Sequence, residues 1–309
     1  MASNFLDRPS TSNRDGRSLL LPEGPWQHLT VNAGGANFHV AQMGPADGEP
    51  VILLHNFPRT WYTMRPVLEA LAGAGYRAWA MDLRGFGMSD LQPHGQDPLR
   101  MSADVAAVIS SLSLESAHVI GAGMGGKLGW ILAATNPRTV RSLMSIAEPH
   151  PLNLEHASPS PFTAAGRTIA KIRAPWVNIH QLRSGKIIEE TAKTWAAPAT
   201  VSNARADEAV YRYAFSRPFA AETALEAVIR VNALTRRTRK RIDTVIDLPI
   251  SRVICTLDPI RPPKTFLRDQ QWARQPITSY EIGCGHFPTE EAPAKLNEAV
   301  LDHMRRVTA

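Results

Sequence analysis

Cysteine is scarce in this sequence, and no long apolar run occurs. The only cysteines are Cys255 and Cys284, which are too few for a disulfide scaffold and match no metal motif in their spacing. Such usage is typical of a protein in the reducing cytoplasm. No window approaches the roughly 18 unbroken apolar residues of a membrane-spanning helix, so no membrane partner is expected. Residues 1–17 lack the apolar segment of a signal peptide, and their polar composition predicts a disordered leader.

Cofactor and nucleic-acid motifs are missing as well. There is no dinucleotide fingerprint after the first expected strand, no Walker sequence and no cluster of metal ligands, so we expect no cofactor and no metal. The net charge of +6 would suit nucleic acid, but five basic side chains form one run within residues 236–241, and no aromatic residue interrupts it. Such a run usually forms a solvated helix end, and no nucleic-acid partner is expected.

The apolar residues that are present form short strand-like runs separated by stretches of helix length, a pattern typical of parallel β/α units. Two alternating runs near the start, residues 27–31 and 37–41, flank Asn32-Ala33-Gly34-Gly35, which predicts an antiparallel hairpin. The other expected strands are Val51–His55, Ala78–Leu83, His118–Gly121, Ser142–Ala147, Arg252–Leu257 and Ile277–Ile282, and the expected helices are Met64–Ala74, Ala103–Ser113, Met124–Thr135 and Pro293–Arg305.

The strand rhythm stops between Pro149 and Leu248 and then resumes at Pro249. The intervening stretch has a helical pattern, is rich in alanine and arginine, and is interrupted by prolines. A helical insertion between two strands covers the carboxyl ends of the strands, where open α/β sheets bind ligands. We therefore expect an α/β core of residues 18–148 and 249–309 and a helical cap of residues 149–248. The alternative is a structural insertion with no pocket beneath it.

A glycine-rich segment, Gly121-Ala122-Gly123-Met124-Gly125-Gly126, lies between an expected strand and an expected helix. This is the context of a nucleophile elbow, G-x-Nuc-x-G, in which the tight turn and close helix–strand packing need glycine. Together with the segments described next, it resembles the α/β-hydrolase family, most closely the epoxide hydrolase and haloalkane dehalogenase branch, from about Pro22 to about Arg305. The resemblance implies an eight-stranded, mostly parallel sheet into which the helical cap is inserted.

Five other segments carry the resemblance, in the order and at the spacing of the family. His55-Asn56-Phe57-Pro58 is similar to the family's H-G-x-P, which implies an anion or oxyanion site at His55, Asn56, Phe57 and Met124. Asp82 to Asp90 is similar to the D-x-R-G-x-G-x-S-D turn, where we expect a salt bridge between Asp82 and Arg84. The others are Glu148-Pro149-His150-Pro151 at the exit into the cap, Leu257-Asp258-Pro259-Ile260 as the acid turn, and Gly283 to Pro288, followed by Glu291 and Pro293, as the catalytic-histidine loop.

The departures from the family are equally informative. Where the family has His followed by Ser or Asp, this chain has Ala122 and Gly123. Glycine has no side chain and cannot form an ester with any substrate, so the nucleophile position is interpreted as vacant. Epoxide hydrolases use cap tyrosines to donate to the epoxide oxygen, and where one is expected, near Leu225-Glu226, this chain has Ala227 and Val228. Ordinary epoxide hydrolysis is therefore not expected.

The resemblance retains a base. His286 held by Asp258 is the orienting half of a triad, in which the carboxylate fixes the tautomer and the imidazole accepts a proton near neutral pH. Glu148, at the end of a strand beside the elbow, is a third catalytic candidate; alternatively it pairs with an arginine or caps a helix. The retained His286 and Asp258 are also compatible with a folding relic that only joins two loops.

Aromatic residues within the expected cap are candidates to line an apolar ligand pocket: Trp176, Trp195, Tyr211 and Tyr213. Three hypotheses follow. The first is a cofactor-independent enzyme that uses His286 and Asp258 as a general base on an apolar small molecule. The second is a ligand-binding protein that has lost its chemistry, and the third is an epoxide hydrolase or esterase with an altered elbow. The oligomeric state stays open, with a homodimer as one option.

Overall fold

The computed structural model describes the chain apart from residues 1–15, 93, 155–158, 175–176 and 309. Trp176 and all but the last two residues of the predicted leader therefore lie outside the described residues. Eight strands form one sheet in the order β1-β2-β4-β3-β5-β6-β7-β8, antiparallel from β1 through β2 to β4 and parallel elsewhere. The strands are β1 (Gln27–Ala33), β2 (Ala36–Met43), β3 (Pro50–Leu54), β4 (Arg77–Met81), β5 (Ala117–Ala122), β6 (Val140–Ile146), β7 (Ile250–Cys255) and β8 (Thr278–Ile282).

The predicted α/β-hydrolase fold is thereby confirmed, and the strand boundaries differ from the predicted ones by at most two residues. The hairpin between β1 and β2 turns at Gly34 and Gly35, whose φ angles of 55° and 78° lie in the left-handed region that favours glycine. Every residue of β3 and of β5 is buried, as expected for central parallel strands that are covered on both faces.

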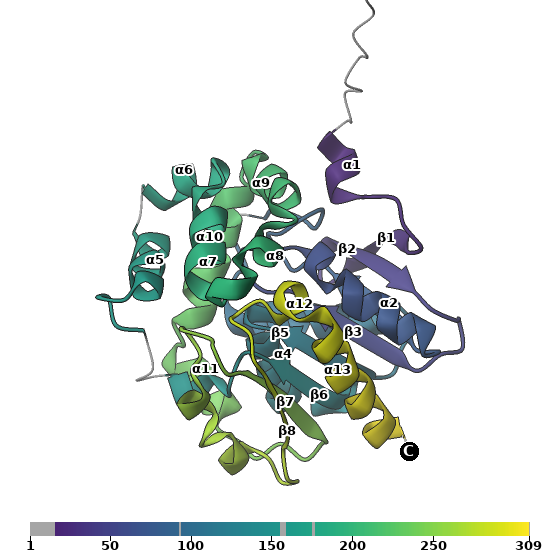
Figure 1. Ribbon diagram of the computed structural model, residues 1–309. Coiled ribbons are helices and arrows are strands. Elements are labelled where there is room, and N and C mark those ends of the chain that lie inside the picture. The colour runs from purple at the N-terminus through teal and green to yellow at the C-terminus, as the bar shows by residue number, and fades with distance from the viewer. Residues whose placement is uncertain (1–15, 93, 155–158, 175–176, 309) are drawn as a thin grey trace, which may run out of the picture.

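Helices cover both faces of the sheet (Figure 1). On one face α2 (Arg65–Gly73) contacts α13 (Pro293–Thr308), and on the other α3 (Pro98–Ser111) contacts α4 (Met124–Thr135). The start of α3 was predicted at Ala103 and lies instead at Pro98. The reason is a local signal: the Asp97 side chain accepts from the Arg100 amide and caps the helix, and proline is favoured in the first turn.

Most of the helices between β6 and β7 lie in a layer at the upper left of the sheet in Figure 1, and the last of them, α11 (Arg236–Ile242), lies lower and contacts the core helix α4. Residues of this layer and of the loops that follow β5 to β8 line a common cavity, so the layer covers the carboxyl ends of these strands. Its helices are α5 (Ala164–Arg173), α6 (Val177–Arg183), α7 (Lys186–Trp195), α8 (Val201–Arg205), α9 (Glu208–Ser216) and α10 (Ala220–Asn232); the short α1 (Gly16–Leu20) and α12 (Pro288–Glu291) lie outside it.

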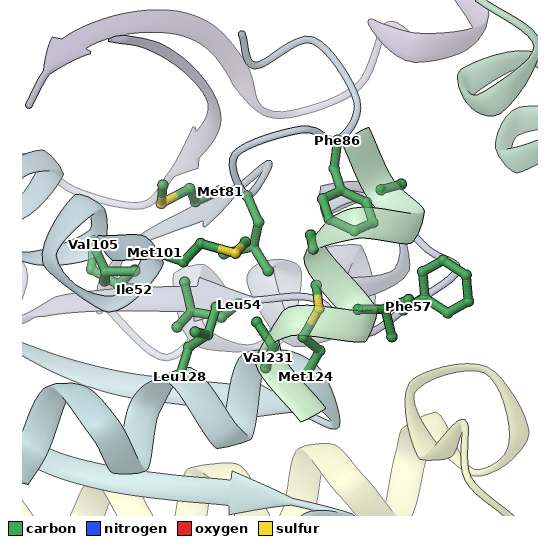
Figure 2. Packing of buried hydrophobic residues seen from close by; sticks show 14 of the residues in the cluster. Ile52, Leu54, Phe57, Met81, Phe86, Met101, Val105, Met124, Leu128 and Val231 are labelled. Atoms are coloured by element: carbon green, nitrogen blue, oxygen red, sulfur yellow. The ribbon is translucent and has the colours of Figure 1, made fainter. Parts of the chain in front are cut away.

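The sheet and the helical layer share one hydrophobic cluster. Figure 2 shows Val231 of α10 close to Met124 and Leu128 of α4, and Phe86 and Phe57 on the same side of the cluster. All five side chains are almost completely buried. Because burial of apolar area contributes about 25 cal/mol per Å², this shared cluster holds the layer against the sheet and positions the site between them.

Candidate active site

His286 and Asp258 are brought together by the loops that follow two neighbouring strands, β8 and β7. The His286 Nδ1 atom lies 2.7 Å from Asp258 Oδ2, and the Asp258 Oδ1 atom accepts from the amides of Ile260 at 2.8 Å and Arg261 at 3.0 Å. Both side chains are buried, and the imidazole lines the cavity. The carboxylate occupies Nδ1, which leaves Nε2 for a ligand or water.

The Glu291 carboxylate holds the backbone of the loop that carries His286. Its Oε2 atom accepts from the amides of Gly285 and Ala197, each at 2.8 Å, and its Oε1 atom accepts from the Phe287 amide at 2.8 Å. The carbonyl of Trp195 in turn accepts from the His286 amide at 2.9 Å. Sequence reasoning named Glu291 only as part of a motif, because its partner in the helical layer, Ala197, carries no pattern that could reveal it.

Gly123 occupies the sharp turn between β5 and α4, with φ 49° and ψ −114°. This conformation is disfavoured for residues with a side chain. The space beside it is filled by Asn56: a Cβ atom added at Gly123 would lie 2.1 Å from Asn56 Oδ1 and 2.4 Å from Asn56 Nδ2. No real Cβ tolerates such contacts, so Gly123 and the observed orientation of Asn56 depend on each other.

The Asn56 side chain accepts hydrogen bonds from two backbone amides. Its Oδ1 atom accepts from the amides of Phe57 at 2.8 Å and Met124 at 3.0 Å. Two N–H groups directed at one atom identify it as the amide oxygen. The Nδ2 atom is buried and has no hydrogen-bond partner within the described part of the chain. A neutral carboxamide therefore occupies the donor pair that the sequence predicted as an anion or oxyanion site.

His55 is placed differently from the prediction. Its Nε2 atom accepts from the Leu83 amide at 3.1 Å, and its Nδ1 atom donates to the Asn56 carbonyl at 2.9 Å. Burial lowers the pKa of His55, opposed by the charge of Asp82, which favours the neutral imidazole. Asn56, Phe57 and Met124 line the cavity whereas His55 does not. The inclusion of His55 in the anion site was wrong, because its ring joins two loops behind the site.

Glu148 lines the cavity but has two cationic partners. Arg261 donates to its Oε2 atom at 2.6 Å, and Lys127 Nζ lies 3.1 Å from its Oε1 atom. Burial would raise the pKa of Glu148, but Arg261 and Lys127 outweigh it and the pKa is lowered. A carboxylate that is held ionised by two cations is a weak base. Of the two roles considered, Glu148 takes that of an ion-pair partner of arginine, and it is not a candidate proton acceptor.

Two aromatic predictions and one salt bridge are also corrected. Trp195 lines the cavity and contacts His286 edge-on, with ring centroids 5.6 Å apart. Tyr211 is buried away from the cavity and donates to Glu290 at 2.9 Å, and Tyr213 is half-buried and absent from the lining. Arg84 pairs with Asp104 at 2.6 Å, whereas Asp82 pairs with His39 at 2.8 Å, so the predicted bond between Asp82 and Arg84 is wrong.

The cavity itself has a volume of about 510 Å³, which is within the range of small-molecule sites. One part of its wall is apolar and includes Trp195, Ile172, Val228 and Ile260, and another part is charged. The basic run predicted as a solvated helix end forms α11, and its five cations are exposed. Of these, Arg239 lies in the cavity wall.

Comparison with known proteins is consistent with this architecture. Residues 49–180 match a family model described as the alpha/beta hydrolase fold. An AB hydrolase superfamily protein of Bacillus subtilis, YfhM, is 39% identical over 132 residues, which are 42% of this chain and 46% of that protein. Epoxide hydrolase B of Mycobacterium tuberculosis is 36% identical over 127 residues, 40% of this chain and 35% of that protein. The matched segments thus span less than half of these curated relatives.

Solved structures match over most of the chain. An α/β hydrolase from Nostoc sp PCC 7120 aligns with a TM-score of 0.80 at 21% identity, covering 90% of this chain and 98% of that chain. An epoxide hydrolase from Pseudomonas aeruginosa aligns with a TM-score of 0.75 at 23% identity, covering 93% and 97%. At such identities the likeness concerns the fold. Among the described residues, the structure contains no helix with the length and apolar character needed to cross a bilayer.

Proposed function

We propose that this chain, an α/β-hydrolase-fold protein with homologues among epoxide hydrolases, is a cofactor-independent enzyme that acts without a covalent nucleophile. In this proposal, His286 held by Asp258 is the general base. The substrate is a small molecule with an apolar body, bound in the cavity between the core and the helical cap of residues 149–248. The reactions open to such a site are elimination, ring opening or closing, isomerisation, carbon–carbon cleavage, or hydrolysis by directly activated water.

The observation that carries the proposal is the 2.7 Å contact between His286 Nδ1 and Asp258 Oδ2 at the wall of the cavity. A carboxylate in this position fixes the proton on Nδ1, so Nε2 carries the lone pair that accepts a proton. It also stabilises the imidazolium that forms after proton transfer. A relic that only joined two loops would not require the ring to line a cavity of substrate size.

The turn at Gly123 supports the non-covalent part of the proposal. We place the family's nucleophile position at Gly123, which has no group to form an ester. The Asn56 carboxamide fills the adjacent space and accepts from the Phe57 and Met124 amides. While it does so, these donors are not available to an oxyanion. Mechanisms that pass through a tetrahedral intermediate at this turn are therefore disfavoured, whereas direct proton transfer to His286 needs neither group.

Two other functions remain as alternatives. A ligand-binding protein would use the same cavity, with His286 and Asp258 as a structural pair. An altered epoxide hydrolase or esterase would regain activity once a nucleophile was restored. The fit of the Asn56 carboxamide to the Gly123 turn disfavours the second alternative, because Asn56, Ala122 and Gly123 would all have to change together.

The test is turnover on a panel of apolar epoxides, lactones, esters and β-hydroxy ketones, followed by mass spectrometry of the intact protein. For any compound converted, His286→Ala should lower the rate by about 10²–10⁴-fold, the usual range for general-base catalysis. Asp258→Asn should also lower it, because the tautomer and the imidazolium lose their support. No covalent adduct should accumulate at any time.

The matched control is His180→Ala, which removes an exposed histidine of α6 and should leave turnover unchanged. Loss of turnover in this variant too would point to a general effect on the fold. Conversion that persists in His286→Ala, or binding of panel members with no conversion of any, would contradict the proposal and favour the binding protein. Two results together would favour the altered hydrolase. One is rapid epoxide hydrolysis by the variant that combines Asn56→Gly, Ala122→His and Gly123→Asp. The other is a native reaction that no longer depends on His286.

A further inference from the structure

The cavity beside His286 is lined by more positive than negative charge. Among the described lining residues Glu148 is the only carboxylate, and there are four cations: Lys127, Arg173, Arg239 and Arg261. Arg239 has interactions of its own, and the other three cations exceed Glu148 by two positive charges at neutral pH. Asp258 lies behind His286, and counting it as well still leaves an excess of one positive charge. A site for a purely apolar molecule has no need of such an excess.

Two of the cations meet at one carboxylate, and a third lines the same cavity. Arg261 and Lys127 contact the two oxygens of Glu148 at 2.6 Å and 3.1 Å, and Lys127 also donates to Asn232 Oδ1 at 2.6 Å. Burial lowers the pKa of Lys127, and the charges of Arg261 and Arg173 lower it further against the opposing charge of Glu148. Arg173 lines the same cavity as the buried lysine. Lys127 and Arg261 thus share one carboxylate, and Arg173 adds a third positive charge to the same wall.

We propose that Lys127, Arg173 and Arg261 form a carboxylate subsite, so that the molecule bound beside His286 is an apolar monocarboxylate. This inference rests on the proposed function in assuming that the cavity is the substrate site. It adds the charge and the polar group of that substrate, which neither the fold nor the His286–Asp258 pair specifies.

Charge and geometry favour a monoanion. Three cations less Glu148 leave an excess of two, but Arg173 is exposed and its charge is partly screened by salt. About one unscreened positive charge remains in the buried part, where an unpaired charge is costly. Glu148 shows that Lys127 and Arg261 bind a carboxylate at hydrogen-bond distance, and the guanidinium of Arg261 suits carboxylate geometry. Ile172, Val228 and Ile260 supply the apolar wall for the remainder of the molecule.

The experiment is calorimetric titration of the full chain with phenylalkanoic acids, from phenylacetate to 6-phenylhexanoate, and with their primary amides. Each acid that binds should bind at least about fivefold more tightly than its amide at low salt, and the difference should shrink as salt screens the exposed arginine. Arg173→Gln should weaken the acids by about 3–10-fold, a typical result of losing one nearby partly exposed charge, and leave the amides unchanged.

Arg167→Gln is the matched control. Arg167 lies on the same helix, is exposed, donates to the Phe162 carbonyl and does not line the cavity. The proposal is overturned if no acid binds more tightly than its amide, including the case in which none binds. It is also overturned if Arg167→Gln weakens the acids as much as Arg173→Gln does. Tighter binding of 4-phenylbutyl phosphate than of 4-phenylbutyrate would contradict a monocarboxylate, because a phosphate ester is largely a dianion at pH 7.

Failure of this inference and failure of the proposed function give different results. His286→Ala should leave the preference for acid over amide in place, because the imidazole is not part of the subsite. A retained preference with turnover that is insensitive to His286→Ala would refute the general base and keep the subsite. Turnover that depends on His286 without any preference for acids would support the general base and refute the subsite.

Discussion

At the scale of single residues, Asn56 and Gly123 form a coupled pair. The Asn56 carboxamide accepts from two backbone amides, and its atoms lie where any side chain on residue 123 would begin. Either residue alone resembles an ordinary substitution in the sequence. Together they place a neutral amide beside a turn without a side chain, which is the basis of the proposed non-covalent chemistry.

Gly123→Ala should therefore lower the free energy of unfolding by about 2–5 kcal/mol. Left-handed backbone contributes roughly 1–2 kcal/mol of this, and the clash with Asn56 adds about 1–3 kcal/mol of overpacking. In the Asn56→Gly background the clash is gone, so the same change should cost only the backbone part. Urea unfolding of the four proteins should give a coupling energy of about 1 kcal/mol or more.

Gly35→Ala is the control for the backbone part, because Gly35 has φ 78° and an added Cβ atom would have no atom of the described residues within 4 Å. Gly35→Ala should lower the free energy of unfolding by about 1–2 kcal/mol, both in the parent protein and in the Asn56→Gly background. Equal costs of Gly123→Ala with and without Asn56 would show that the two residues are independent.

At the scale of secondary-structure elements, a buried chain of side chains joins three parallel strands to α13. His118 Nδ1 of β5 lies 2.8 Å from Ser142 Oγ of β6, which lies 3.0 Å from His303 Nε2 of α13. His303 Nδ1 lies 2.8 Å from Ser251 Oγ of β7. Burial lowers the pKa of both histidines to about 4. The chain stabilises the fold only while both rings are neutral.

This chain predicts a loss of stability in weak acid. In the unfolded protein His303 binds a proton near pH 6.5, whereas in the folded protein it does so near pH 4. Its contribution is therefore complete above pH 6.5 and is lost as the pH falls towards 4, by about 3 kcal/mol for a shift of this size. Denaturant unfolding between pH 7 and 4 should show the decline, and His303→Gln should make it shallower by the share of His303, while the share of His118 remains.

His180→Gln provides the comparison, because His180 is exposed on α6 and should leave the slope of stability against pH unchanged. A slope in His303→Gln as steep as in the parent protein would mean that other groups, the buried carboxylates among them, account for the acid sensitivity.

At the scale of the whole molecule, the helical layer and the sheet share a single hydrophobic cluster (Figure 2). Charged contacts reinforce it: Arg59, in the loop after β3, pairs with Glu290 at 2.8 Å and donates to the Ala204 carbonyl of α8 at 3.0 Å. Tyr211 of α9 donates to the same Glu290. These contacts tie the layer to the core, which has a second hydrophobic cluster of its own between the sheet, α2 and α13.

The protein should consequently unfold in one cooperative transition, followed in parallel by tryptophan fluorescence and far-UV circular dichroism. Val231→Ala removes buried methyl groups at the junction of α10 and α4, and should lower the free energy of unfolding by about 2 kcal/mol with both signals shifting together. Val245→Ala, at a side chain that is 52% exposed, should change it by less than about 0.5 kcal/mol. Two separated transitions would show that the layer folds independently.

Much of the fold followed from local sequence patterns. Period-two and continuous apolar runs predicted all eight strands, and the segment between Gly123 and Asn136 predicted α4 as observed, Met124–Thr135. The resemblance to the family implied the pairing of His286 with Asp258, and the structure places the two side chains in contact on loops that follow β8 and β7. The start of α3 was missed although Asp97-Pro98 carried the signal.

Sequence alone thus determined the element types, their order and the loops that meet at the carboxyl ends of the strands, because these depend on local periodicity and chain direction. Tertiary structure decided which partner each polar side chain takes. Glu148 is held by Lys127 and Arg261, and Asn56 fills the donor pair beside Gly123. Such choices arise between segments far apart in the chain, where burial makes an unpaired polar group costly and the nearest available partner satisfies it.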